Sequence, residues 1–143
     1  MSAFRGGLWS VLAGAAVVAS AAGRAGAEEV QWRGDYRAAR REASEKNRPL
    51  VLVFGTAHCA WCRKLETDTL RDPSVTGLLN EHFIPLAIDA DQNAALAQAL
   101  HVQTYPTLVF AAPDGKILGT REGFVDATAF RRQLRQVLEG AGR

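Results

Sequence analysis

Short runs of apolar residues alternate along the chain with segments whose apolar residues recur at helical spacing. Residues 50–54 form a continuous apolar run, which is typical of a strand buried on both faces. Residues 83–88 and 107–111 have the same character, and residues 116–120 follow a Pro-Asp-Gly turn. The pattern therefore predicts three buried strands and a fourth that completes a hairpin.

Helix start and stop signals separate these strands. Asp35, Asp72 and Asp126 are suitable helix caps, and Pro73 follows one of them at a first-turn position. The predicted helices run from Asp35 to about Lys46, from Cys59 past Glu66, from Asp72 past Leu79, over residues 91–100, and from Asp126 to Gly140. Strands that alternate with helices in this order predict an α/β fold with a central mixed sheet flanked by helices on both faces.

The first 27 residues differ from the rest of the chain. Arg5 precedes an uncharged apolar stretch over residues 8–22, and small residues follow up to Ala27. This order predicts a signal peptide over residues 1–27 and a mature domain over residues 28–143, located in the periplasm or secreted. The apolar stretch is shorter than the roughly 20 residues that span a bilayer. Cleavage after Ala21 and an uncleaved signal anchor are the alternatives.

Removal of that segment changes the charge of the protein. The whole chain carries 17 basic and 15 acidic residues, and loss of Arg5 and Arg24 leaves 15 of each. A nucleic-acid-binding domain usually has a basic excess, so this class is not expected. A length of 143 residues, with 48% hydrophobic and 22% charged residues, fits one globular domain.

The chain contains only two cysteines, Cys59 and Cys62. A secreted domain held together by disulfides would have several cysteines spread along its length. A bridge between these two closes a very short loop and constrains little of the unfolded chain. Cys59 is expected at a helix N-terminus, which favours a thiolate that can attack a disulfide, and Cys62 would then resolve the mixed disulfide.

Several segments together carry a family resemblance. They are the strand over residues 51–54 before Cys59-Ala60-Trp61-Cys62, the segment over residues 68–75, the segment Ile88 to Asn93, and the segment Thr104 to Leu108. Over about residues 32–139 the chain resembles thioredoxin-like domains, in particular secreted single-domain members and the C-terminal domain of the thiol:disulfide interchange protein DsbD. The resemblance implies a thioredoxin fold and thiol–disulfide oxidoreductase activity at Cys59 and Cys62, with no cofactor.

The resemblance also implies roles for residues around the cysteines. Pro106 matches the cis-proline of the family, and Tyr105 before it would offer backbone groups to a substrate strand; a trans proline at a strand edge is the alternative. Trp61 is expected to cover the disulfide and contact partners. A protonated His58 would stabilise the Cys59 thiolate, unless it is only an exposed loop residue.

The sequence departs from thioredoxin at the proton acceptor. Thioredoxin has a buried Asp six residues before its first cysteine, paired with a buried Lys, and this chain has Val53 and Ala87 at the matching positions. Glu66, one turn after Cys62, is the candidate proton relay through water, and a solvated surface carboxylate is the alternative. The sequence therefore predicts no buried proton acceptor for Cys62 at the thioredoxin position.

The sequence argues against two other uses of the cysteine pair. A zinc site would need a second closely spaced ligand pair, and His58, His82 and His101 are isolated, so no metal is expected. Haem attachment needs His after Cys62, where Arg63 stands. The alternatives that remain are a thiol oxidase or isomerase and a non-catalytic binding or chaperone module. The favoured hypothesis is a monomeric reductase of exported disulfide-containing or dithiol proteins, recharged by a membrane electron donor.

Overall fold

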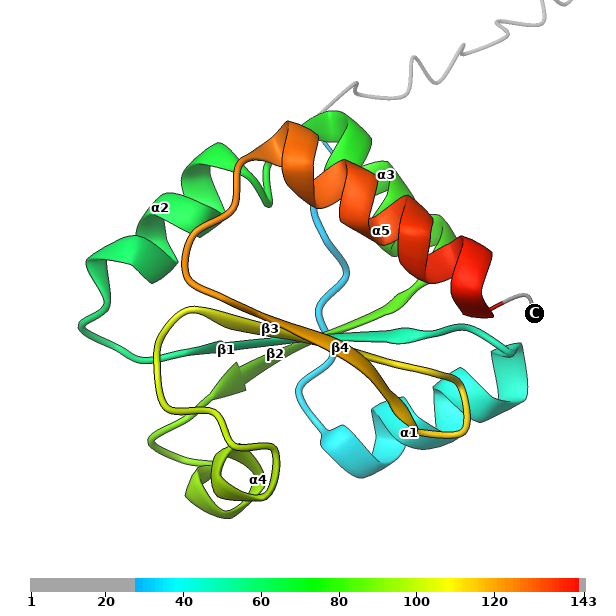
Figure 1. Cartoon of the computed structure of the whole chain (residues 1–143), viewed down its shortest axis with the longest axis horizontal. Helices are drawn as coiled ribbons and strands as arrows, with labels where there is room; N and C mark the ends of the chain where they lie inside the picture. The colour runs from blue at the N-terminus through cyan, green and yellow to red at the C-terminus, as the bar shows by residue number, and fades with distance from the viewer. Residues whose placement is uncertain (1–27, 142–143) are drawn as a thin grey trace, which may run out of the picture.

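The computed structural model describes residues 28–141, which form a mixed sheet with helices on both faces (Figure 1). The fold class predicted from the sequence is confirmed. The elements in chain order are α1 (Tyr36–Lys46), β1 (Leu50–Gly55), α2 (Ala60–Asp68), α3 (Pro73–His82), β2 (Ile84–Asp89), α4 (Ala94–Ala99), β3 (Thr107–Ala111), β4 (Ile117–Glu122) and α5 (Ala127–Ala141).

The four strands lie in the order β2-β1-β3-β4, and β1 is parallel to β2 and antiparallel to β3. Each face of the sheet has its own apolar core. One core packs α1 and α4 against β1, β2 and β3, with Leu52 and Leu86 near its centre. The other packs α2, α3 and α5 against Val51, Leu108 and Phe110. The cysteine-bearing helix α2 therefore shares its face of the sheet with α3 and α5 (Figure 1).

An N-terminal arm, residues 28–33, lies against the outer side of β2. The Arg33 N–H donates to the Pro85 carbonyl at 2.9 Å, and the Ala87 N–H donates to the Arg33 carbonyl. The Asn80 side chain accepts from the Gln31 N–H and donates to the Glu29 carbonyl. These bonds hold the arm against the middle of β2 and the last turn of α3.

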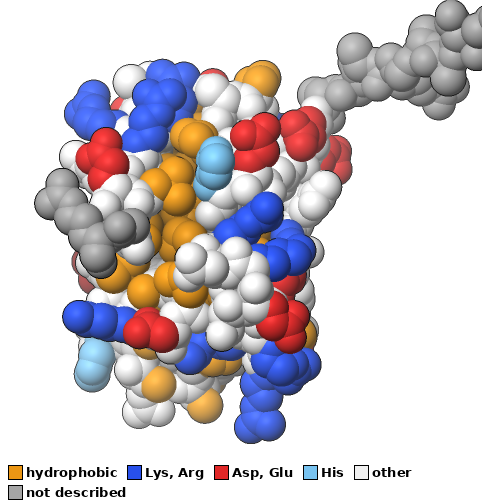
Figure 2. Space-filling view, turned by 90° about the vertical axis from the view of Figure 1, so that its right-hand side faces the viewer, with side chains coloured by type: hydrophobic (Ala, Val, Ile, Leu, Met, Phe, Trp, Pro, Cys, Tyr) orange, Lys and Arg blue, Asp and Glu red, His pale blue; other side chains and the backbone are white. Residues whose placement is uncertain are grey.

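The predicted signal peptide, residues 1–27, lies outside the described residues. Within residues 28–141 no helix has the length and apolar character to cross a membrane. Figure 2 shows the face at the opposite end from the cysteines, where an apolar strip is surrounded by side chains of both charges.

Candidate redox site

Cys59 and Cys62 form a disulfide at the N-terminus of α2, with Cα atoms 5.2 Å apart. Cys59 is the N-cap residue, and its Sγ accepts the Cys62 N–H at 3.1 Å. Its side chain therefore lies where the unpaired N–H groups and the helix dipole favour negative charge. Cys59 is partly exposed whereas Cys62 is only 9% exposed, so Cys59 is the sulfur that a partner can reach first.

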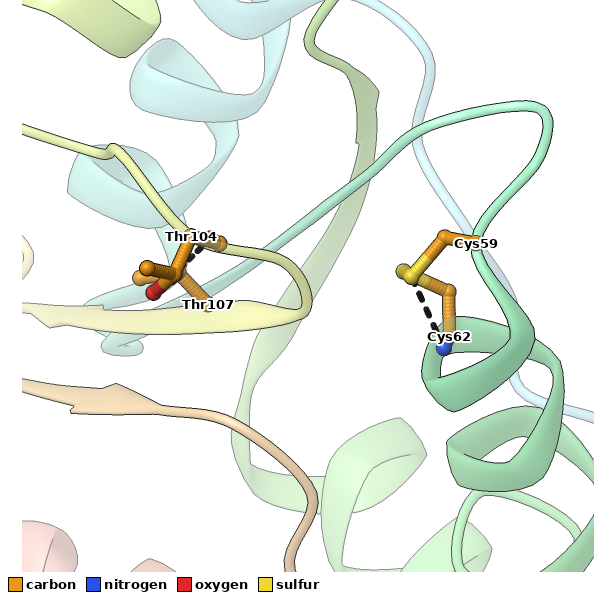
Figure 3. Close-up of a disulfide and its surroundings, with 4 residues drawn as sticks. All are labelled: Cys59, Cys62, Thr104 and Thr107. Atoms are coloured by element: carbon orange, nitrogen blue, oxygen red, sulfur yellow. Dashed lines mark hydrogen bonds between the residues drawn. A yellow bond between two sulfur atoms is a disulfide. The ribbon is translucent and has the colours of Figure 1, made fainter.

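The loop before β3 lies opposite the disulfide (Figure 3). The peptide bond between Tyr105 and Pro106 is cis, and Pro106 is buried. Two hydrogen bonds hold this loop: the Thr107 hydroxyl donates to the Thr104 carbonyl at 2.6 Å, and the Gly123 N–H donates to the Pro106 carbonyl at 2.8 Å. The loop is thereby fixed both within itself and to the chain that follows β4.

Two aromatic rings lie side by side next to the cysteines. Trp61, between the cysteines, is 56% exposed, and its ring centroid lies 6.1 Å from that of Phe124. The Lys64 ammonium lies 5.0 Å from the centre of the Phe124 ring. Phe124 follows Gly123, whose φ of +82° is one that glycine adopts readily. No pattern in the sequence connects Phe124 with the cysteines, so the structure adds it to the site.

The other predicted site residues have different surroundings. His58 is exposed directly before Cys59. Tyr105 is partly buried and packs against the core on the α1 and α4 face of the sheet, so its backbone rather than its ring is available to a partner at this loop. Glu66 is exposed on α2 and lines the same cavity as Cys62.

Val53 and Ala87 are cross-strand neighbours on β1 and β2, and both line that cavity. Neither side chain can accept a proton. Among residues 28–141, no three His, Cys, Asp or Glu side chains come together as a metal site requires.

Comparisons with known proteins agree with this geometry. A family model described as "Thioredoxin-like domain" matches residues 36–138. The chain belongs to the thioredoxin-like family. Among solved structures, it is similar to a thioredoxin from Thermus thermophilus, with a TM-score of 0.73, 28% identity, and coverage of 80% of this chain and 91% of that one.

Two further similarities differ in how much of the other protein they cover. The reduced C-terminal domain of Neisseria meningitidis DsbD is similar with a TM-score of 0.60 and 26% identity, over 70% of this chain and 91% of that one. Spermatogenesis-associated protein 20 of Rattus norvegicus is 27% identical over 74 residues, which is 52% of this chain but 9% of that protein. A thioredoxin-like fold with a disulfide at Cys59 and Cys62 is thus established, as expected of a thiol–disulfide oxidoreductase.

Proposed function

We propose that this protein is exported and reduces disulfides of other exported proteins through Cys59 and Cys62. The observation that carries the proposal is the position of the pair: the accessible Cys59 caps α2, and Cys62 lies one turn further along. Cys59 as thiolate attacks a substrate disulfide and forms a mixed disulfide. Cys62 then attacks Cys59, and the substrate leaves reduced.

The groups around the pair support binding of a polypeptide substrate. The Tyr105–Pro106 loop faces the disulfide and offers backbone groups to an extended chain, as an added strand would require. Trp61 and Phe124 present an aromatic surface beside it. In an oxidising compartment a reductase must be recharged, so the proposal includes an electron-donor protein in the membrane. The reducing direction is proposed from the resemblance of the cysteine motif and the Thr104 to Leu108 segment to those of DsbD-type domains.

Trapping of substrates tests the proposal. A Cys62→Ser variant keeps the attacking sulfur but cannot resolve the mixed disulfide, so it is expected to accumulate covalent adducts with exported proteins. These adducts should disappear on treatment with dithiothreitol. A double variant, Cys59→Ser with Cys62→Ser, is the matched control and should form none.

The same variants separate catalysis from binding alone. Reduction of a disulfide-bonded protein substrate is expected to fall to the uncatalysed rate in both variants. If the double variant retained the biological activity, the protein would be a binding or chaperone module, and the proposal would be wrong.

A further inference from the structure

A cavity of about 880 Å³ reaches Cys62 from the side of β2 and the N-terminal arm. Cys62 is in its wall together with the buried Leu65, whereas Cys59 is not among the lining residues. A molecule in this cavity would therefore meet the resolving sulfur and not the attacking one.

Three small or apolar residues keep the space beside Cys62 open. Val53 and Ala87 stand where thioredoxin has its buried Asp and Lys, and both line the cavity. Gly55 has no side chain, and a Cβ there would lie 3.3 Å from the Cys62 Sγ. A larger residue at any of these positions would take up space that leads to the sulfur.

The outer end of the cavity is open to water and acidic. Glu28, Glu29, Glu66 and Asp89 line it, together with Arg71, and all five side chains are exposed. Since a water molecule takes up about 30 Å³ of liquid, the volume holds many waters or a small buffer molecule. In a mature protein that begins at Glu28, the α-amino group of that residue adds a second positive charge beside Arg71. Four carboxylates against these two cations still favour entry of neutral or cationic molecules over anions.

We propose that small bases from solution remove the Cys62 proton through this cavity, in place of a buried carboxylate. The inference rests on the proposed function and concerns its second step. The base takes the Cys62 proton, and the Cys62 thiolate attacks the Cys59 Sγ of the mixed disulfide. The bond between Cys59 and Cys62 forms as the bond to the substrate sulfur breaks. That sulfur leaves with the electron pair and takes a proton from water, so the substrate gains two electrons and the dithiol loses two.

The test follows the resolving step by stopped flow. The reduced protein is mixed with a symmetrical aromatic disulfide that releases a coloured thiolate, which should appear in two phases. The Cys62→Ser variant identifies the second phase because it should lack that phase. The rate of the second phase is then measured against imidazole concentration at fixed pH and ionic strength. We expect it to rise about threefold over the accessible range, as general-base catalysis requires.

Variants and a second buffer define the route. Ala87→Leu should reduce the slope of the second-phase rate against imidazole concentration about tenfold, because the larger side chain fills the cavity. Ala95→Leu is the same change at an exposed site on α4 and should leave this slope unchanged. Phosphate, which is anionic and buffers in the same pH range, should give a smaller slope than imidazole. This buffer comparison needs no variant, so the test stands even if Ala87→Leu does not fold.

Several outcomes would overturn the inference. A second phase that does not depend on imidazole would show that solution bases do not reach Cys62, and the proposed function would be unaffected. A second phase that is slowed by Glu66→Gln and does not depend on imidazole in the wild-type protein would assign the proton to Glu66 alone. Release of one coloured thiolate per wild-type protein, instead of two, would contradict the proposed function itself.

Discussion

His58 and Cys59 are neighbours in the chain but have different surroundings. The imidazole is exposed, whereas the Cys59 sulfur caps α2 and accepts the Cys62 N–H. A positive charge on His58 would add to the field of the helix N-terminus and favour the thiolate, although solvent would weaken the effect.

We predict that His58→Ala lowers the reactivity of Cys59. In a Cys62→Ser background, the rate of alkylation by iodoacetamide near neutral pH should fall about two- to threefold, since a surface charge interaction contributes below 1 kcal/mol. The difference should vanish at high pH, where Cys59 is fully ionised. His82→Ala is the control, because His82 is an exposed histidine on α3. Equal rates in all three proteins would show that His58 does not act on Cys59.

At the scale of elements, the N-terminal arm depends on an ion pair. The Arg33 backbone pairs with β2. Its guanidinium binds both carboxylate oxygens of Glu42 on α1. Lys46, one turn further, binds the same carboxylate at 2.9 Å. The hydrogen bond from Arg33, followed by that from Lys46, lowers the pKa of Glu42 from 4.5 to about 2.

The low pKa of Glu42 predicts a pH-dependent contribution to stability. The pair stabilises the fold above the unfolded-state pKa near 4.5, and the contribution is lost as the pH falls toward 2. Glu42→Gln should therefore lower the free energy of unfolding by about 1 kcal/mol at pH 7, with a smaller effect near pH 2. Urea unfolding at several pH values measures this. Glu45→Gln, on the exposed side of α1, is the control and should change little; an equal loss in both variants would refute the role of the pair.

The sequence predicted all the helices and strands in the correct order, because strand runs and helix caps are local signals. Asp35 and Asp72 accept the expected N–H groups of α1 and α3. The predicted ends of the helices and strands were less accurate. Phe83 was expected in a strand but ends α3, where its N–H still donates to Leu79. The helix expected from Asp91 begins at Ala94, since the Asp91 N–H donates to the Asp89 side chain in a turn.

At the scale of the whole molecule, the cavity beside Cys62 was not predictable from the sequence. It is built by the arm, the end of β1, the end of β2 and α2, which are far apart in the chain. Val53 and Ala87 indicated what is missing there, but their register across β1 and β2 comes from the fold. Similarly, the contact of Trp61 with Phe124 joins residues with no shared sequence signal. The cysteine pair, in contrast, was predictable from the sequence, because its spacing and the strand before it are local signals.

Export concerns the whole molecule, because it sets the compartment in which the cysteine pair works. N-terminal sequencing of the protein recovered from the exported fraction should begin at Glu28, after the small residues that end at Ala27. Formal charges then balance in the mature protein. An intact Met1 in the exported protein would contradict cleavage, and a protein found only inside the cell would contradict export.

The reduction potential of the Cys59–Cys62 pair decides whether the protein acts as a reductase. The purified protein is equilibrated in glutathione and dithiothreitol buffers, and free thiols are trapped with a mass label. We expect a reversible two-electron transition near or below about −230 mV, the range of reducing thioredoxin-like proteins. A value between about −180 and −120 mV would assign the pair to an oxidase or isomerase. No reversible transition would contradict a redox function for Cys59 and Cys62.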